Sequence, residues 1–283
     1  MSNMLIVYRN YLDTAALSGG DWSSGLPLDN LAHPHPSRVA RSTDADPASS
    51  WFEVDFGAQR PVSFAGILNH NLSQRGTWRV RLFNASLEEP ELDTGAVPIW
   101  PRVVPFGTGH WGEFQWGGHL DTETAETYGI GSYAILPAAR RVRNVRVDLD
   151  DPDNPAGYLQ AGRALLAPAW TPSVNLQYGW SIEQVDESRI VKSRGGQAYF
   201  DGKPKYRRLR FRIEHLDIDE MLANAYELER LKGTGGDILA MVDPDDTAHL
   251  HRRTVYGRIA ETTPIVNDFD ERYSKEFVIE ELY

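Results

Sequence analysis

The sequence contains no cysteine among its 283 residues. This absence excludes disulfides, thiolate metal sites and any mechanism that uses a cysteine nucleophile. Long apolar runs are missing too, because no stretch approaches the roughly 18 residues that a membrane-spanning helix needs. The first residues, MSNMLIVYRNYL, hold a short apolar patch without the basic segment that opens a secretory signal. We therefore expect a soluble chain with neither a secretion signal nor a membrane span.

Positive charge is scarce, with 29 Lys and Arg against 40 Asp and Glu and a net charge of −11 at pH 7. An acidic surface repels a phosphate backbone, which argues against a general nucleic-acid-binding protein. Lysine is absent before Lys192. Slightly earlier, Pro168 and Pro172 interrupt the segment LLAPAWTPSVN and remove backbone donors. With 41% apolar residues, the chain can bury two ordinary cores, and we expect domains over 1–167 and 168–283.

The first domain is rich in alternating segments. Residues 51–56 alternate apolar and polar side chains, 57–60 indicate a turn, and 62–68 are typical of a more buried strand. Residues 77–83 alternate again, and the polar break NHNLS separates them from the preceding strand as in a hairpin. Later segments with the strand pattern are 132–137 and 142–150. Many short strands separated by turn signals predict a β-sandwich.

The second domain has a different order of elements. Strand patterns appear in NLQYGWSIEQ, QAYFDG and YRRLRFRIEHL, and the last predicts an inner face of Leu209, Phe211 and Ile213. One helix follows, DIDEMLANAYELERLKG, with Asp217 or Asp219 as its N-cap. Its predicted inner face and end are Met221, Ala225, Leu228 and Gly233. Three further strands, GGDILAMVDP, HRRTVYGRIAE and SKEFVIEEL, complete a small β-sandwich or split barrel with one helix.

The first domain resembles the discoidin-type jelly roll, the coagulation factor 5/8 C-like module, as it occurs in bacteriophage tail proteins. The resemblance covers roughly residues 20–165 and lies in the loop around Arg41 and Ser42, Trp51 with EVDFG, Arg60-Pro61-Val62, and the NHNLS break. The segment RRVRNVRVDLDD is similar to the closing strand of that module. The resemblance implies a jelly-roll β-sandwich over 1–167.

The second domain resembles the tail-tube fold of tube, distal tail and baseplate hub proteins of long-tailed phages. The likeness lies in the order of its elements, from YRRLRFRIEHL through the helix to HRRTVYGRI and FVIEEL. It implies a hexameric ring at the tail tip of a virion, made in the host cytoplasm and joined to tail-tube and baseplate hub proteins. Genome DNA would pass through an acidic lumen without specific binding, because phosphate binding needs cations placed against it. A ring also removes exposed strand edges.

Aromatic residues in IWPRVVPFGTGHWGEFQWGGHL suggest a binding face on the jelly roll. Tryptophans can stack on a sugar of the host surface while arginine and histidine donate hydrogen bonds to it. The alternative, which we favour, is that these aromatics pack in the sandwich or against a neighbouring subunit. The residues concerned are Trp100, Trp111, Trp116, Arg102, His110 and His119.

Two other clusters carry oxygen or nitrogen ligands. DLDDPDNPAG offers Asp148, Asp150, Asp151 and Asp153, a density that suits a hard cation such as calcium but is equally typical of a turn. The pairs His33 and His35, and His249 and His251, lack an obvious third metal ligand. We expect neither a metal nor another cofactor.

An enzyme is not expected. The carboxylates Asp243, Asp245, Asp246, Glu261 and Asp268 supply the residue type of a glycosidase pair but also suit charged loops. The basic segment SRIVKSRGG places Arg189, Lys192 and Arg194 where tube-like proteins have a loop that reaches the next ring, with a solvated hairpin as the alternative. We interpret the chain as a tail-tip structural protein. The alternative is a carbohydrate-binding protein that acts through its first domain.

Overall fold

The computed structural model describes residues 2–84, 87–100, 102–104, 118–119 and 131–282. These residues form a mainly β protein with a single long helical segment, as predicted from the alternating patterns. The chain divides into two compact units: unit 1 comprises Met1–Ile6, Thr171–Pro244 and Arg253–Tyr283, and unit 2 comprises Val7–Trp170 and Asp245–Arg252. This division differs from the expected one mainly in two places: the first six residues belong to the C-terminal unit, and Asp245–Arg252 belong to the N-terminal unit.

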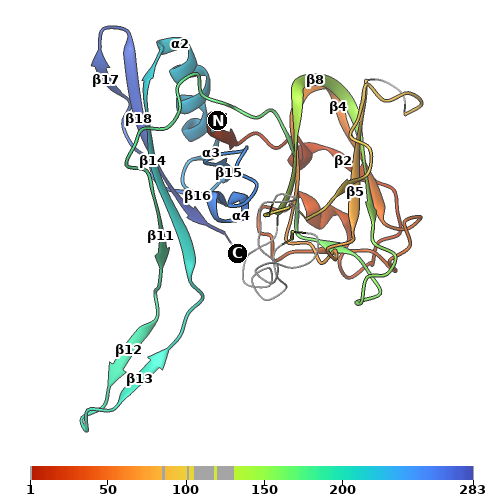
Figure 1. The fold of residues 1–283 in the computed structure, drawn as a ribbon, viewed down its shortest axis with the longest axis horizontal. Coiled ribbons are helices and arrows are strands. Elements are labelled where there is room, and N and C mark those ends of the chain that lie inside the picture. Colours follow the sequence, from red (N-terminus) through yellow and green to blue (C-terminus); the bar gives the residue numbers. More distant parts are fainter. Residues whose placement is uncertain (1, 85–86, 101, 105–117, 120–130, 283) are drawn as a thin grey trace. The chain divides into compact units, whose positions relative to one another are not determined.

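Unit 2 is built on two long antiparallel strands, β4 (Trp51–Leu68) and β8 (Gly131–Asp150). β10 (Arg163–Ala167) pairs with β4, and β5 (Thr77–Phe83) pairs with β8, so the sheet order is β10-β4-β8-β5-β6. Figure 1 shows β4 and β8 bending over together, so that the sheet curls on itself. The smaller elements are η1 (Tyr11–Thr14), β2 (Ala16–Ser18), η2 (Leu28–Ala32), β3 (Ala40–Arg41), β6 (Leu92–Asp93), β7 (Val97–Pro98) and β9 (Gln160–Ala161).

Two local predictions for unit 2 were wrong. The segment 57–60 does not reverse the chain but is a bend inside β4. The pairing with β8 shifts register between Asp55 and Arg60, and Gly57 has a φ of 69°. Glycine adopts this positive φ without a steric penalty, which allows the strand to bend and continue. Residues 51–83 do not form a hairpin either, because β8 lies between β4 and β5. Alternation predicts strands and their faces, but it does not identify their partners.

The core of unit 2 follows the alternation. Phe52 and Val54 on β4 and Val145 and Val147 on β8 are each at most 2% exposed. The intervening residues carry charges on the opposite face, where Arg146 lies between Glu53 and Asp148. Burying a full apolar side chain stabilises the fold by about 1.5–3 kcal/mol, whereas an exposed ion pair contributes about 0–1 kcal/mol. The apolar face therefore determines the fold of unit 2.

The NHNLS break is a connection between loops rather than a simple turn. The Asn71 side chain donates to the Tyr158 carbonyl at 2.9 Å and accepts from the Gln160 amide at 2.8 Å. Its neighbour His70 is buried, with Nε2 2.9 Å from the Ser132 hydroxyl. Burial of a polar group costs free energy unless hydrogen bonds replace those to water. These contacts therefore allow the polar segment to be partly buried in unit 2.

Unit 1 contains a sheet with the order β1-β15-β16-β18-β14-β11, and β17 pairs with the first residues of β18. Its inner face includes the predicted Leu209, Phe211 and Ile213, each at most 2% exposed, and the Phe211 ring stacks on Phe277 at 5.2 Å between centroids. The strands are β1 (Leu5–Val7), β11 (Ser181–Val185), β14 (Tyr206–Leu216), β15 (Asp237–Met241), β16 (Thr254–Glu261), β17 (Val266–Phe269) and β18 (Arg272–Glu281). A short helix, α4 (Leu250–Arg253), precedes β16.

One helical segment packs on this sheet through the predicted face of Met221, Ala225 and Leu228, each 0% exposed. The Asp217 carboxylate caps its start by accepting from the Glu220 amide at 2.8 Å. The segment is not a uniform α-helix, because α2 (Ile218–Glu220) and α3 (Glu227–Lys232) flank a π-helical stretch, η3 (Met221–Tyr226). Such stretches are rare and are frequent at functional sites.

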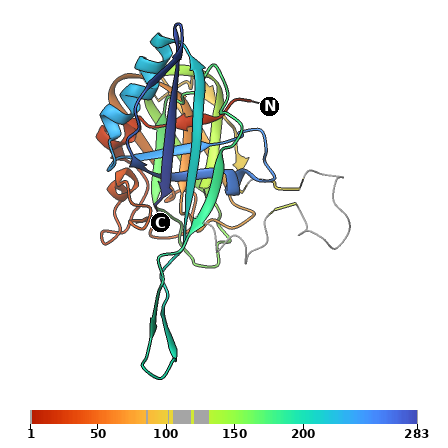
Figure 2. The same ribbon diagram turned by 90° about the vertical axis from the view of Figure 1, so that its left-hand side faces the viewer.

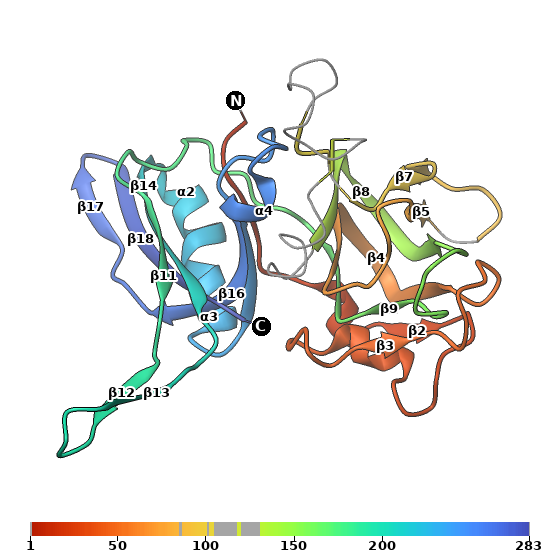
Figure 3. The same cartoon turned by 60° about the horizontal axis from the view of Figure 1, so that its bottom comes forward.

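A narrow hairpin extends from unit 1 between β11 and β14. It consists of β12 (Arg189–Lys192) and β13 (Ala198–Asp201), which form a two-stranded sheet of their own. Figures 2 and 3 show this hairpin projecting beyond the edge of the unit 1 sheet. We call residues 186–205 the arm. Among the described residues, no helix is long and apolar enough to cross a membrane.

Candidate functional site

The arm exposes apolar side chains on both of its faces. In the register of β12 and β13, Ile190 lies opposite Phe200 and Val191 lies opposite Tyr199. Because consecutive residues point to opposite faces of a strand, each face of the arm carries one of these apolar pairs. The exposed fractions are 61% for Ile190, 62% for Val191, 57% for Tyr199 and 73% for Phe200. The two-stranded arm therefore has no core of its own.

Polar contacts hold the base of the arm. The Ser188 amide donates to Asp186 at 2.9 Å, and the Ser188 hydroxyl accepts from the Lys203 amide at 2.9 Å. The pKa of the Asp186 carboxyl is lowered, mainly by the hydrogen bonds that Ser188 donates to it. These contacts define where the arm leaves the sheet, while the apolar pairs beyond them stay open to solvent.

The three basic residues predicted for an inter-ring loop lie on the arm. Arg189 and Lys192 are in β12, opposite Asp201 and Ala198, and Arg194 lies in the turn. All three side chains are exposed. The arm carries five cations and three acids, a charge of +2 within a chain of −11. Its contact with a neighbour stays a prediction.

Exposed apolar side chains concentrate in unit 1. Among the described residues, eleven of the thirteen large apolar side chains that are exposed belong to unit 1, and only Leu87 and Ile135 belong to unit 2. Monomeric proteins rarely expose large contiguous apolar patches. The eleven are Tyr178, Ile190, Val191, Tyr199, Phe200, Ile218, Leu222, Tyr226, Leu231, Val266 and Phe269.

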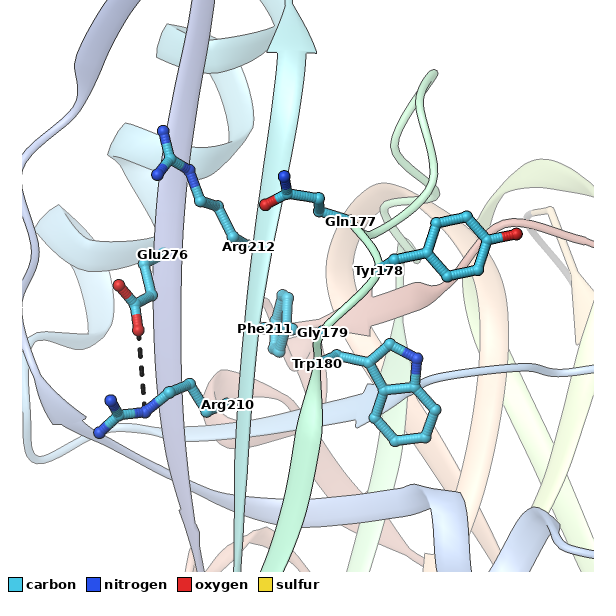
Figure 4. A pocket seen from close by; sticks show the side chains of 8 residues that line it. All are labelled: Gln177, Tyr178, Gly179, Trp180, Arg210, Phe211, Arg212 and Glu276. Atoms are coloured by element: carbon cyan, nitrogen blue, oxygen red, sulfur yellow. Dashed lines mark ion pairs between the residues drawn. The ribbon is translucent and has the colours of Figure 1, made fainter.

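A cleft of about 160 Å³ lies where the chain enters β11. Figure 4 shows Tyr178 and Trp180 on one side of it and the charged side chains of Arg210, Arg212 and Glu276 on the other. Arg210 and Glu276 are 3.7 Å apart, a loose ion pair. Arg212 is held by Asp268 at 3.2 Å and by the Ser274 hydroxyl at 2.7 Å. The cleft is shallow and polar, without the enclosed apolar lining typical of small-molecule sites.

The predicted aromatic face is only partly within the described residues. Trp100 is buried, donates from its indole nitrogen to the Leu72 carbonyl at 2.8 Å and packs edge-on against His70. This environment matches packing rather than sugar stacking for Trp100. Arg102 is exposed. Trp111, Trp116 and His110 lie outside the described residues.

The aspartates of 148–153 do not converge on one point. Asp148 lies on β8 and pairs with Arg81 at 2.7 Å and Arg146 at 3.0 Å. Asp151 is buried and accepts from the Ser73 amide at 2.6 Å and the Asn154 side chain at 2.8 Å. Asp150 and Asp153 are exposed. In the part of the chain that the structure describes, no group of three metal-ligating side chains is present.

The other titratable candidates are dispersed. His249 pairs with Asp246 at 3.1 Å, and the His33 and His35 rings lie 5.3 Å apart. Asp268 contacts Arg212 on the unit 1 sheet, and Glu261 is exposed at the end of β16.

Sequence reasoning missed a polar and aromatic cluster in unit 2. The Arg41 guanidinium lies 4.0 Å from the centre of the Tyr158 ring, and its Nη2 donates to Gln160 at 3.0 Å. The pairing of β3 with β9 brings these distant residues together. Arg41 was noted in the sequence only as part of a loop, because a sequence pattern contains no signal for a pairing of two-residue strands.

No family model matches the sequence, and no curated protein matches it. Similar solved structures include a fucose-binding module from Streptococcus pneumoniae, with 12% identity, a TM-score of 0.37 and coverage of 56% of this chain and 95% of that chain. The family 32 CBM from C. perfringens NanJ, in complex with galactose, has 9% identity, a TM-score of 0.37 and coverage of 58% and 99%. A chitosan-binding module from Paenibacillus sp. IK-5 has 11% identity, a TM-score of 0.38 and coverage of 57% and 99%.

These three structures are carbohydrate-binding modules, and none of them is a phage tail protein. With TM-scores below 0.5 and identities of 12% or less, the similarities establish neither a ligand nor a partner for this chain.

Proposed function

We propose that this protein is a non-catalytic assembly protein, in which unit 1 joins copies of the chain and unit 2 is a β-sandwich carried on the assembly. The observation behind this proposal is the arm, whose four apolar side chains are 57–73% exposed. An isolated two-stranded hairpin is marginally stable in water. Contact with another chain would remove these side chains from water and stabilise the arm at the same time.

The edges of the unit 1 sheet support the same proposal. Among the described residues, the terminal strands β1 and β11 each pair on one side only, and exposed edges are suited to pairing with another chain. A closed ring of subunits removes such edges. The setting we propose is a ring at the tip of a phage tail, with genome DNA passing through it and tail-tube and hub proteins as neighbours. It is supported by the order of elements in residues 168–283 and by the net charge of −11, which disfavours adhesion of DNA.

The test is the mass of the purified full chain over a range of concentrations, by light scattering and native mass spectrometry, followed by negative-stain electron microscopy. We expect a mass that is a multiple of 31.8 kDa at high concentration and ring-shaped particles. The variant Ile190→Ser/Phe200→Ser should reduce the association at least about tenfold, since each buried apolar side chain contributes about 1.5–3 kcal/mol. The matched control is Leu87→Ser/Ile135→Ser in unit 2. A chain that stays monomeric at all concentrations would overturn the proposal.

Carbohydrate binding by unit 2 is a second candidate, and the Arg41 and Tyr158 cluster favours it. Sugar sites combine an aromatic ring with a few polar groups, and this cluster supplies a half-buried ring, a guanidinium and the Gln160 amide. The similar modules named above bind fucose, galactose and chitosan, which makes these sugars the first probes. Glycan-array binding by the full chain that is lost in Arg41→Ala would support this candidate. Retention of binding in that variant would place the sugar elsewhere.

A further inference from the structure

One end of unit 1 is chemically opposite to the arm. The arm precedes β14 and the helical segment follows it, so the two lie at opposite ends of an eleven-residue strand, roughly 35 Å apart along its axis. Figure 1 shows the arm at one end of the unit 1 sheet and α2 with the β17–β18 connection at the other. We call residues 217–219 and 269–271 the distal end.

The register of the sheet brings the two parts of the distal end together. Leu216 at the end of β14 pairs with Tyr273 at the start of β18, and Phe269 pairs with Arg272 across the β17–β18 turn. The His215 and Phe269 rings lie 6.0 Å apart, and Arg272 donates to the His215 carbonyl at 3.3 Å. The helix start and the β17–β18 turn are therefore neighbours on one surface.

That surface is acidic and partly apolar. Ile218 is 39% exposed and Phe269 is 64% exposed. Four acids surround them: Asp217, Asp219, Asp270 and Glu271, all exposed. Asp217 caps the helix, and Arg272 is the cation beside this group. The distal end thus has the opposite charge to the arm, and both combine that charge with uncovered apolar side chains.

We propose that the distal end is the docking surface for the arm of a second copy of this chain. The inference rests on the proposed assembly function and names the surface that receives the arm. Charge complementarity selects the occupant, because Lys192 and Arg194 at the tip of the arm would face Asp270 and Glu271. Phe200 and Ile190 would lie against Phe269 and Ile218. A contact between two different surfaces of one chain is head-to-tail, so one arm and one distal end stay free for further copies until a ring closes.

Charge reversal on each side tests the docking in the full chain. In the variant Lys192→Glu/Arg194→Glu, the arm and the distal end are both acidic. In the variant Asp270→Lys/Glu271→Lys, both surfaces are basic. All four side chains are exposed, and Lys192 lies opposite the neutral Ala198, so neither change breaks a cross-strand ion pair. Each variant alone should associate at least about tenfold more weakly than the unmodified chain at low salt. An equimolar mixture of the two should recover the association, because every arm then meets a distal end of opposite charge.

The outcomes separate the two proposals. If the unmodified chain associates but Asp270→Lys/Glu271→Lys does so equally well, or the mixture fails to recover, the distal end does not receive the arm although the assembly function stands. If the unmodified chain does not associate at all, the assembly function itself fails. A second pair, Asp243→Lys and Glu261→Lys, reverses acids of unit 1 outside the distal end and should leave the association unchanged. Circular dichroism of each variant confirms that the fold is retained.

Discussion

Within the described residues, unit 2 covers nearly all of its large apolar side chains, and unit 1 leaves many of its own open to solvent. A hydrophobic core cluster lies entirely in unit 2, with residues from Leu12 to Leu166. Unit 1 holds eleven of the thirteen exposed large apolar side chains among the described residues. A β-sandwich with a closed core needs no further contacts, whereas a sheet with an uncovered arm gains stability from a partner.

The strongest contrast is between two phenylalanines. Phe52, 1% exposed in the core of unit 2, should lose about 3–5 kcal/mol of the free energy of unfolding when replaced in Phe52→Ala. Phe200, 73% exposed on the arm, should change the unfolding of the isolated monomer by less than about 0.5 kcal/mol in Phe200→Ala. Urea unfolding at a concentration where the chain is monomeric measures both. Equal losses would show that the arm is covered within one chain.

Lys275 is the most deeply buried charged side chain of unit 1 among the described residues, and the removal of its partner tests how far the interior depends on polar contacts. Lys275 is 2% exposed, 2.9 Å from Glu229 and 2.7 Å from the Thr263 carbonyl. Glu229→Ala should destabilise unit 1 by about 3 kcal/mol, because it leaves a buried ammonium without its counter-charge. The control Glu229→Leu/Lys275→Met removes both charges and should be nearly neutral. A loss in the double variant as large as in the single one would assign the effect to packing instead of charge.

Acid should weaken unit 2 through His70. Burial, opposed by the nearby Asp151 carboxylate, lowers the pKa of His70 from 6.5 to about 4. The unfolded chain then binds more protons between these values, so the contribution of His70 is complete above pH 6.5 and is lost as the pH falls toward about 4. The loss is roughly 3 kcal/mol or less. Urea unfolding from pH 8 to 4 measures it against His70→Gln, which should lack this part of the slope. Parallel curves for the two proteins would contradict the assignment.

The smallest expected effect concerns the start of the helical segment in unit 1. Asp217 accepts from the Glu220 amide at 2.8 Å, so Asp217→Ala should cost about 1 kcal/mol. Asp219→Ala, two residues away and without such a bond among the described contacts, is the matched control and should cost less than about 0.5 kcal/mol. Thermal unfolding distinguishes the two. A larger loss in Asp219→Ala than in Asp217→Ala would show that Asp219 is the residue that stabilises the start of the helical segment.

Local patterns predicted several elements closely. The alternation in YRRLRFRIEHL matches β14, and its apolar residues face the interior as expected. The helical face of Met221, Ala225 and Leu228 is buried as predicted. These agreements have one cause, because the period of a strand or helix is a property of the backbone and appears directly in the order of side chains.

The remaining features depend on contacts between distant residues. The placement of β8 between β4 and β5, the joining of β1 to the unit 1 sheet, and the meeting of Arg41 with Tyr158 depend on which strand lies beside which. The same holds for the meeting of His215 and Phe269 beside the distal end, which follows from the register of β14 and β18. Strand periodicity specifies an inner and an outer face for each segment. The partner of that face is selected by the packing of the whole unit, since many pairings bury a similar apolar area and differ only in how well they close the core.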